Sequence, residues 1–132
     1  MCIFCMIANG EIPTNKVYED DNVLAFLDLS QATLGHTLVI PKKHFDNIYA
    51  LDQETSANVF KVTQKLAKQI RNNLNAKGVN ILNNNEPQAG QSINHFHIHI
   101  LPRYENDDLE IKFTEHKLSD QEFKDLLEKI KK

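Results

Sequence analysis

The sequence predicts an α+β fold: a mainly antiparallel sheet of about five strands, one long helix packed on it, a short N-terminal helix and a C-terminal helix. Short segments with strand character are joined by turn residues, which is typical of antiparallel sheets. Residues 53–77 carry apolar residues at helical spacing, and residues 95–101 alternate histidine with apolar residues, which is the period of a strand. The length of 132 residues fits one domain, which we expect to span residues 1–132.

The first three elements are short. Residues 3–8 are mostly apolar and predict a helical turn, which Asn-Gly at 9–10 closes because these residue types accept the left-handed backbone at a helix end. Residues 16–19 and 23–27 predict two strands, joined by a hairpin turn at residues 20–22, where Asp-Asp-Asn stands.

The remaining strands follow in the second and third quarters of the chain. Residues 36–40 predict a third strand, which Pro41 ends or places at a sheet edge. Residues 79–82 predict a fourth strand. The polar loop 83–92 then leads directly into the histidine segment, and its polar side chains and glycine suit a close approach of backbone N–H groups to an anion.

Two further helices are expected. Asp52 suits the N-cap of the long helix, residues 53–77, and Gly78 ends it. Residues 119–122 read Ser-Asp-Gln-Glu, a capping box that predicts a C-terminal helix to about Ile130. The long helix covers one face of the sheet through a stripe made of Val59, Thr63, Leu66, Ala67, Ile70 and Leu74.

The most informative stretch is His95-Phe96-His97-Ile98-His99-Ile100-Leu101. On a strand the three histidines face one side, while the apolar residues between them face the other side and enter a core. Side chains two residues apart lie roughly 6.5–7 Å from each other, so the imidazoles can surround a phosphate-sized group or hold a metal. A surface strand with solvated histidines is the plain alternative.

Composition excludes several classes of function. The net charge of −3, with Lys and Glu interleaved, gives no basic surface for duplex nucleic acid. No apolar run approaches the ~18 residues of a membrane span, and the N-terminus does not have the pattern of a signal peptide. We therefore expect a cytoplasmic protein with a small-molecule ligand, no membrane partner and no organic cofactor.

The histidine segment matches in full the signature of the histidine triad (HIT) family, in which three histidines alternate with apolar residues. Residues 35–44 and 90–92 resemble two other segments of that family. The likeness covers about residues 2–103, which leaves about 104–132 as a C-terminal helical extension. The chain is most similar to nucleoside-phosphoramidate hydrolases of the Hint type and their bacterial relatives. This likeness implies a HIT-like fold and a homodimer, with a purine nucleoside monophosphate in the cleft of each subunit.

The resemblance assigns catalysis to four residues. His97 would attack the α-phosphorus and form a covalent nucleotidyl-histidine, which divides one difficult displacement into two easier ones. Its other ring nitrogen should donate to a backbone carbonyl. His99 would contact the phosphate and help protonate the leaving group, with His36 stacked behind it. Ser92 and nearby backbone N–H groups would stabilise charge on the phosphoryl oxygens.

The family pattern also places the substrate. It maps a base pocket onto three apolar residues, which would be core residues in most proteins, and a ribose contact onto Asp28, whose carboxylate can accept two hydrogen bonds. Polar contacts to phosphate or sugar fall on the loop before the histidine segment. The full substrate-binding set is Phe4, Ile7, Phe26, Asp28, Asn84, Gln91, Ser92, His97 and His99.

Cys2 and Cys5, the only cysteines, stand at the spacing of metal ligands. Two thiolates and two imidazoles would close a structural zinc site. Relatives with an N-terminal Cys-x-x-Cys use the first histidine of the motif and an upstream histidine, so the resemblance implies a structural zinc on Cys2, Cys5, His44 and His95. A redox pair of cysteines, and a metal face built from the three motif histidines, stay open as alternatives.

We therefore expect a nucleotide hydrolase or nucleotidyl transferase that cleaves a purine nucleoside 5′-phosphoramidate, or a related phosphoanhydride, at the α-phosphorus. A dinucleoside polyphosphate hydrolase would use the same histidines with a longer cleft. A nucleotide-sensing binding module would hold the same ligand with little turnover. A metal-binding protein using the histidine face would bind more than one metal ion per chain.

Overall fold

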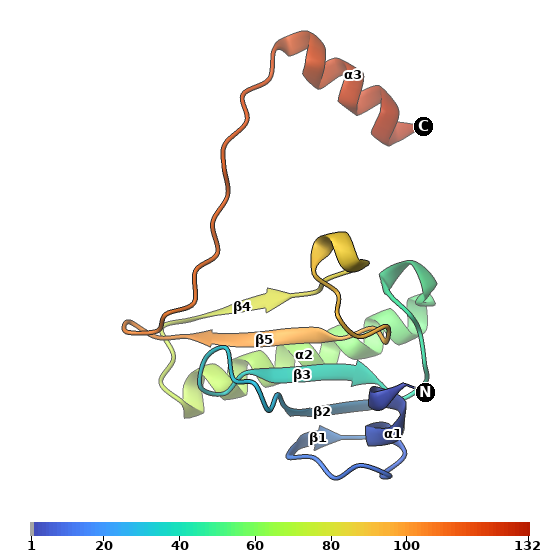
Figure 1. Cartoon of the computed structure of the whole chain (residues 1–132), viewed down its shortest axis with the longest axis vertical. Helices are drawn as coiled ribbons and strands as arrows, with labels where there is room; N and C mark the ends of the chain where they lie inside the picture. Colours follow the sequence, from blue (N-terminus) through green and yellow to red (C-terminus); the bar gives the residue numbers. More distant parts are fainter. Residues whose placement is uncertain (1) are drawn as a thin grey trace.

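The computed structural model describes residues 2–132, and Met1, the first residue of the expected domain, lies outside the described part. A five-stranded antiparallel sheet in the order β1-β2-β3-β5-β4 forms its centre (Figure 1). This confirms the predicted α+β class. The strands are β1 (Lys16–Glu19), β2 (Val23–Leu27), β3 (Thr37–Pro41), β4 (Gly78–Leu82) and β5 (Ile98–Arg103). The helices are α1 (Ile3–Ala8), α2 (Gln53–Asn73) and α3 (Asp120–Lys131), with 3-10 turns at Ile48–Ala50 and Pro87–Ala89.

The sheet separates two apolar cores. On one face α2 packs its buried side against the central strands, and the apolar residues of the histidine segment, Phe96, Ile98 and Ile100, lie completely buried in this core. On the other face α1 packs Phe4 and Ile7 against residues of β2 and β3. The alternation in the sequence therefore predicted the division correctly, because one side of the segment faces the α2 core and the histidines face the other way.

Three strands differ in extent from the prediction, and β4 does so only by beginning one residue earlier, at Gly78. β5 begins at Ile98 and not at His95, because the N–H of Phe96 donates to the carbonyl of Phe45, 2.6 Å away in a loop, and so leaves the strand ladder. β3 includes Pro41 as its last residue and lies between β2 and β5. Pro41 therefore ends a central strand and does not mark a sheet edge.

The predicted C-terminal end of α2 was wrong. The helix stops at Asn73, four residues before Lys77, because Asn75 adopts the left-handed backbone (φ +53°) that terminates helices. The N–H of Ala76 then donates to the carbonyl of Arg71 (3.0 Å), as in a Schellman cap. Asparagine tolerates this conformation better than most residues, so it ends the helix ahead of Gly78, which begins β4 instead.

The C-terminal arm, residues 104–132, ends in α3. The predicted capping box is present: the Ser119 hydroxyl accepts from the N–H of Glu122 (3.2 Å), and the Glu122 carboxylate accepts from the N–H of Ser119 (3.0 Å). Figure 1 shows α3 standing clear of the sheet and of α1 and α2. Along residues 2–132, no helix is both long and apolar enough to cross a membrane.

Candidate active site and candidate metal centre

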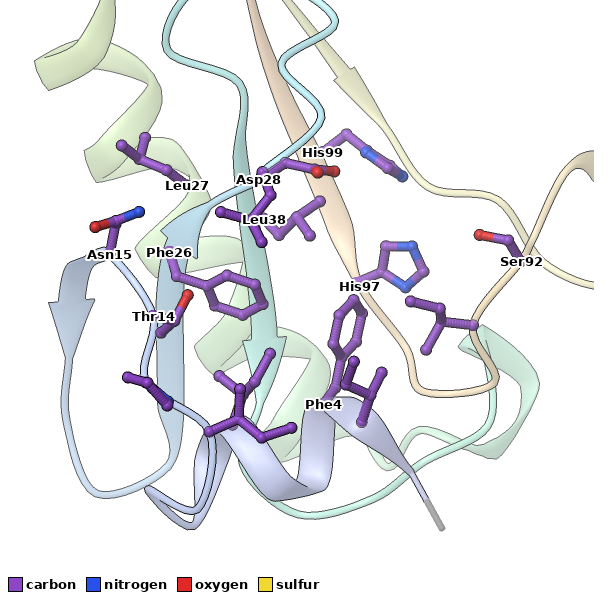
Figure 2. Close-up of a pocket in the computed structure, with 16 residues that line it drawn as sticks. Phe4, Thr14, Asn15, Phe26, Leu27, Asp28, Leu38, Ser92, His97 and His99 are labelled. Carbon is purple, nitrogen blue, oxygen red and sulfur yellow. The ribbon is translucent and has the colours of Figure 1, made fainter.

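A cleft of about 390 Å³ opens on the α1 face of the sheet, a volume in the range of small-molecule sites. Figure 2 shows two unlike sets of side chains around it: aromatic rings such as Phe4 and Phe26, and the polar groups of His97, His99 and Ser92. The other lining residues are Ile3, Ile7, Ile12, Pro13, Thr14, Asn15, Leu27, Asp28, Leu29, Leu38 and Ile93. This arrangement suits a ligand with a flat apolar part and a charged part.

His97 is buried, and its two ring nitrogens differ in their partners. Nδ1 lies 2.8 Å from the carbonyl oxygen of His95. Because a carbonyl only accepts, Nδ1 carries the proton and Nε2 keeps a bare lone pair, as expected from the sequence. Burial lowers the pKa of His97 below its ordinary value, which favours the neutral ring at pH 7. The ring of Phe4 stands nearly perpendicular to it (85°), with centroids 5.2 Å apart.

His36 and His99 form a hydrogen-bonded pair, and the contact at His36 Nδ1 determines which ring nitrogens carry the protons. The backbone N–H of Ala32 donates to His36 Nδ1 (3.2 Å), so neutral His36 carries its proton on Nε2. That N–H donates to His99 Nδ1 (2.9 Å), so the proton of neutral His99 lies on Nε2. The predicted stacking is corrected, because the rings are tilted by 33° with centroids 5.1 Å apart and meet through this hydrogen bond.

Electrostatics keep this pair neutral at pH 7. Burial, followed by the neighbouring His97 and His36, lowers the pKa of His99 to about 4. Burial also lowers the pKa of His36, although the nearby carboxylate of Asp28 and a backbone hydrogen bond with Ser30 act in the opposite direction. One oxygen of that carboxylate, Oδ2, lies 3.7 Å from His36 Nε2, and the other, Oδ1, accepts from the N–H of Ser30 (2.8 Å).

Gln91, a predicted substrate contact, lies outside the cleft lining. Its buried side chain binds only backbone groups: Oε1 accepts from the N–H of Glu86 (2.7 Å), and Nε2 donates to the carbonyls of Asp46 (2.7 Å) and Ile93 (3.0 Å). The carboxamide therefore fastens the loop between β4 and β5. That loop in turn brings Ser92 to the cleft.

Asn84, the other predicted contact from this loop, also lies outside the cleft lining. Its side chain packs over Gly90. Asn83, which sequence reasoning missed, donates from Nδ2 to the carbonyl of His97 (2.9 Å), and Asn85 donates to Asn83 Oδ1 (2.6 Å). A run of three asparagines indicates a polar loop, but it contains no signal for which amide turns inward.

The second cluster brings together the four predicted metal ligands. Cys2, Cys5, His44 and His95 each offer one ligand atom, and these atoms all lie within 4.8 Å of one another. The Cys2 Sγ–His95 Nδ1 and Cys5 Sγ–His44 Nδ1 distances are both 3.4 Å. Ligands about 2.0–2.3 Å from a tetrahedral zinc ion stand about 3.6 Å apart, so the four donors have the right spacing. The other two motif histidines line the cleft, so the three do not form one metal face.

The outer hydrogen bonds of both imidazoles also suit a metal. His95 Nε2 donates to the carbonyl of Pro41 (2.8 Å), and His44 Nε2 donates to the carboxylate of Asp46 (2.7 Å). Each ring therefore turns an unprotonated Nδ1 toward the cysteines. Asp46 was not singled out in the sequence, where it is one acidic residue among many. The chemistry and spacing of the donor set fit a structural zinc ion.

Comparison with known proteins finds one family profile and several relatives that match most of the chain. A family profile described as "HIT domain" matches residues 9–106. Protein hit of Bacillus subtilis (strain 168) is 54% identical over 103 residues, which are 78% of this chain and 71% of that protein. Adenosine 5′-monophosphoramidase hnt1 of Schizosaccharomyces pombe is 37% identical over 130 residues, which are 98% of this chain and 95% of that protein.

Solved structures resemble the whole chain. A protein from Streptococcus mutans UA159 is 47% identical with a TM-score of 0.95, over 98% of this chain and 83% of that one. A HIT family protein from Bacillus subtilis is 44% identical with a TM-score of 0.94, over 98% and 94%. A Zn-bound histidine triad family protein from Mycobacterium smegmatis is 39% identical with a TM-score of 0.79, over 87% and 84%.

The hydrogen-bonded pair of His36 and His99 predicts a specific pH dependence. In an NMR titration of the imidazole resonances, His99 should titrate at about pH 4. Unfolded histidines take up protons near pH 6.5, so between that pH and about 4 the unfolded chain binds more protons than the folded protein. Stability measured by urea unfolding should therefore fall as the pH falls through this window. A His99 midpoint at or above 6.5 would contradict the prediction.

Proposed function

From the premise that the chain belongs to the HIT domain family, we propose that it is a nucleotide hydrolase or nucleotidyl transferase that cleaves a purine nucleoside 5′-phosphoramidate, or a related phosphoanhydride, at the α-phosphorus. One observation carries the proposal: His97 lines the cleft with Nδ1 fixed by the His95 carbonyl and Nε2 bare. The activity in the name of the S. pombe relative supports the choice of a phosphoramidate.

The chemistry divides the displacement at phosphorus into two steps. His97 Nε2 attacks the α-phosphorus, and the bond from phosphorus to the leaving group breaks. His99, with its Nε2–H, donates to the phosphoryl group and helps protonate the leaving group, while Ser92 stabilises negative charge on the oxygens. Water then attacks the nucleotidyl-histidine and releases the nucleoside monophosphate, which restores His97.

The two kinds of side chain around the cleft match the two ends of a nucleotide. The rings of Phe4 and Phe26 meet edge to face at 74°, with centroids 5.6 Å apart, and together with Ile7 they offer an apolar surface for the base. Asp28 would accept hydrogen bonds from the ribose hydroxyls through the oxygen that Ser30 leaves free. Gln91 and Asn84, which the family pattern assigns to the substrate, do not line the cleft and would act by holding the loop that carries Ser92.

Replacing the nucleophile should abolish turnover. We expect wild-type protein to release AMP from adenosine 5′-phosphoramidate and His97→Ala to be slower by about a thousandfold or more, because the covalent route is lost. His116→Ala, which removes an exposed histidine of the arm, is the matched control and should keep full activity. A His97→Ala protein with more than a few per cent of wild-type activity would contradict the assignment.

Two other functions would use the same cleft. A dinucleoside polyphosphate hydrolase would fail on the phosphoramidate and cleave diadenosine tetraphosphate. A nucleotide-sensing module would bind AMP in calorimetry and turn over neither substrate. The bare Nε2 of His97 favours the hydrolases, because a binding module has no need of a nucleophile with a fixed tautomer.

We also propose that the cysteine cluster holds one structural zinc ion. Cys2 and Cys5 flank the start of α1, whereas His44 follows β3 and His95 precedes β5, so shared ligation would tie the first helix to the sheet. α1 carries Phe4 and Ile7 of the cleft, so this tie would fix the apolar surface. The ion would supply folding free energy and take no part in attack.

Metal analysis tests this site. Purified wild-type protein should contain one zinc per chain, and Cys5→Ser should lose the zinc and melt about 10 °C or more lower, because ligation energy adds directly to folding energy. Ser56→Ala, which removes a single oxygen from a half-buried residue of α2 outside the cluster, should keep both the zinc and the melting temperature. Unchanged metal content and melting temperature in Cys5→Ser would exclude the site.

We also propose that the chain forms a homodimer, and the exposed apolar residues of α3 support this. The exposed apolar residues of α3 form one stripe at helical spacing, which we call the α3 stripe: Phe123, Leu126, Leu127 and Ile130. Matches over 98% of the chain to crystal structures from S. mutans and B. subtilis include the arm, and TM-scores of 0.94–0.95 require it to lie in the same place in all three. An exposed apolar stripe on a helix that stands away from its own sheet needs a cover, and a second copy of the chain would provide one.

Substitutions in the α3 stripe should weaken the dimer. We expect wild-type protein at micromolar concentration to have the mass of a dimer in light scattering, and Phe123→Ser with Leu127→Ser to shift it toward monomer, because apolar burial between copies is lost. The pair Lys124→Ser with Glu128→Ser, on the polar side of the same helix, is the control. A monomeric wild type, or an unchanged dimer in the stripe variant, would contradict the proposal.

A further inference from the structure

Gln31 lies in the loop between β2 and β3, and the function described above makes no use of it. Its carboxamide binds only the backbone of its own loop. Nε2 donates to the carbonyls of Asp28 (2.5 Å) and His36 (2.8 Å), and Oε1 accepts from the N–H of Gly35 (2.8 Å). The side chain therefore joins the first residues of the loop to the last, in an otherwise exposed position where no packing requires it.

The same loop supplies the hydrogen bond that sets the protons of the histidine pair. Ala32, the residue after Gln31, donates its N–H to His36 Nδ1 at 3.2 Å, near the upper end of hydrogen-bond distances. A small outward movement of the loop would break this bond. His36 would then be free to carry its proton on Nδ1, and its Nε2 would become an acceptor.

That change would also move the proton of His99 from Nε2 to Nδ1. His99 Nδ1 would have to donate to His36, so the cleft-side nitrogen of His99 would lose its proton and become an acceptor. A bare nitrogen repels a phosphoryl oxygen and has no proton for a leaving group. The direction of the whole hydrogen-bond chain thus depends on the Ala32 amide, together with the Asp28 carboxylate that lies 3.7 Å from His36 Nε2.

We propose that Gln31 is a positioning residue: by closing the loop from Asp28 to His36, it holds the Ala32 amide against His36 and keeps the cleft-side nitrogen of His99 protonated. The consequence for turnover rests on the proposed function, whereas the consequence for the imidazole protons does not. Other contacts keep the loop folded without Gln31, since the Tyr104 hydroxyl donates to the Leu34 carbonyl (2.5 Å) and the N–H of Asp28 donates to the His36 carbonyl (3.0 Å).

The direct test is the tautomer of each ring, read from long-range ¹H–¹⁵N NMR spectra of the full chain at pH 7. In wild-type protein both His36 and His99 should carry the proton on Nε2. Gln31→Ala should populate the Nδ1–H tautomer in both rings. Ala32→Pro, which removes the amide itself, should do the same. Gln64→Ala, which removes an exposed carboxamide on α2, should leave the wild-type spectrum unchanged.

Each outcome decides between the alternatives. Wild-type tautomers in both Gln31→Ala and Ala32→Pro would overturn the proposal. A change in Ala32→Pro alone would show that the amide sets the tautomer and that Gln31 does not, which also overturns it. If Gln31→Ala has folded spectra, its kcat on the phosphoramidate should fall in proportion to the fraction of His99 that still carries the proton on Nε2, so about tenfold when roughly nine-tenths of the rings have changed tautomer. Absence of activity in wild-type protein would contradict the proposed function but would not affect the conclusion about the tautomers.

Discussion

The complete burial of His95 obliges each of its polar groups to find a partner, and those partners connect the two halves of the site. Its Nε2 binds the Pro41 carbonyl at the end of β3, its Nδ1 faces Cys2 and Cys5, and its carbonyl receives the Nδ1 proton of His97. One residue therefore sets the direction of its own imidazole, in the cysteine cluster, and of the His97 imidazole in the cleft. A displacement of this residue would disturb both.

Side-chain periodicity and short motifs allowed the sequence to predict the buried face of residues 95–101, the cysteine cluster and the cap of the C-terminal helix. Alternation in residues 95–101 predicted that Phe96, Ile98 and Ile100 would be buried under α2 while the histidines face the α1 side, because the pleat of a strand leaves no other choice. The Cys-x-x-Cys spacing and the family likeness predicted that Cys2 and Cys5 would lie beside two histidines. The capping box at Ser119 is local chemistry, which needs no knowledge of the fold.

The features that escaped prediction depend on long-range contacts or on backbone groups. The end of α2 required knowing that Asn75 would take a left-handed conformation, when Gly78 gave the stronger signal. Gln91 and Asn83 turn toward backbone carbonyls that only the folded loop presents. The donor to His36 is the amide of Ala32, and a backbone N–H has no signature in a sequence because every residue except proline carries one.

The arm leaves the sheet at Arg103, whose side chain is held by several hydrogen bonds, and this fixed start bears on how α3 contributes to stability. Arg103, the last residue of β5, is bound by the carboxylate of Asp107 through two hydrogen bonds and by the side-chain oxygen of Asn80, so the chain leaves the sheet in a fixed direction. Within residues 2–132, the apolar side of α3 has no cover from its own sheet. In the proposed dimer that side would be buried against the second copy, so its contribution to stability would follow mass action. Dilution would then expose the apolar residues of α3, and the melting temperature would depend on the protein concentration.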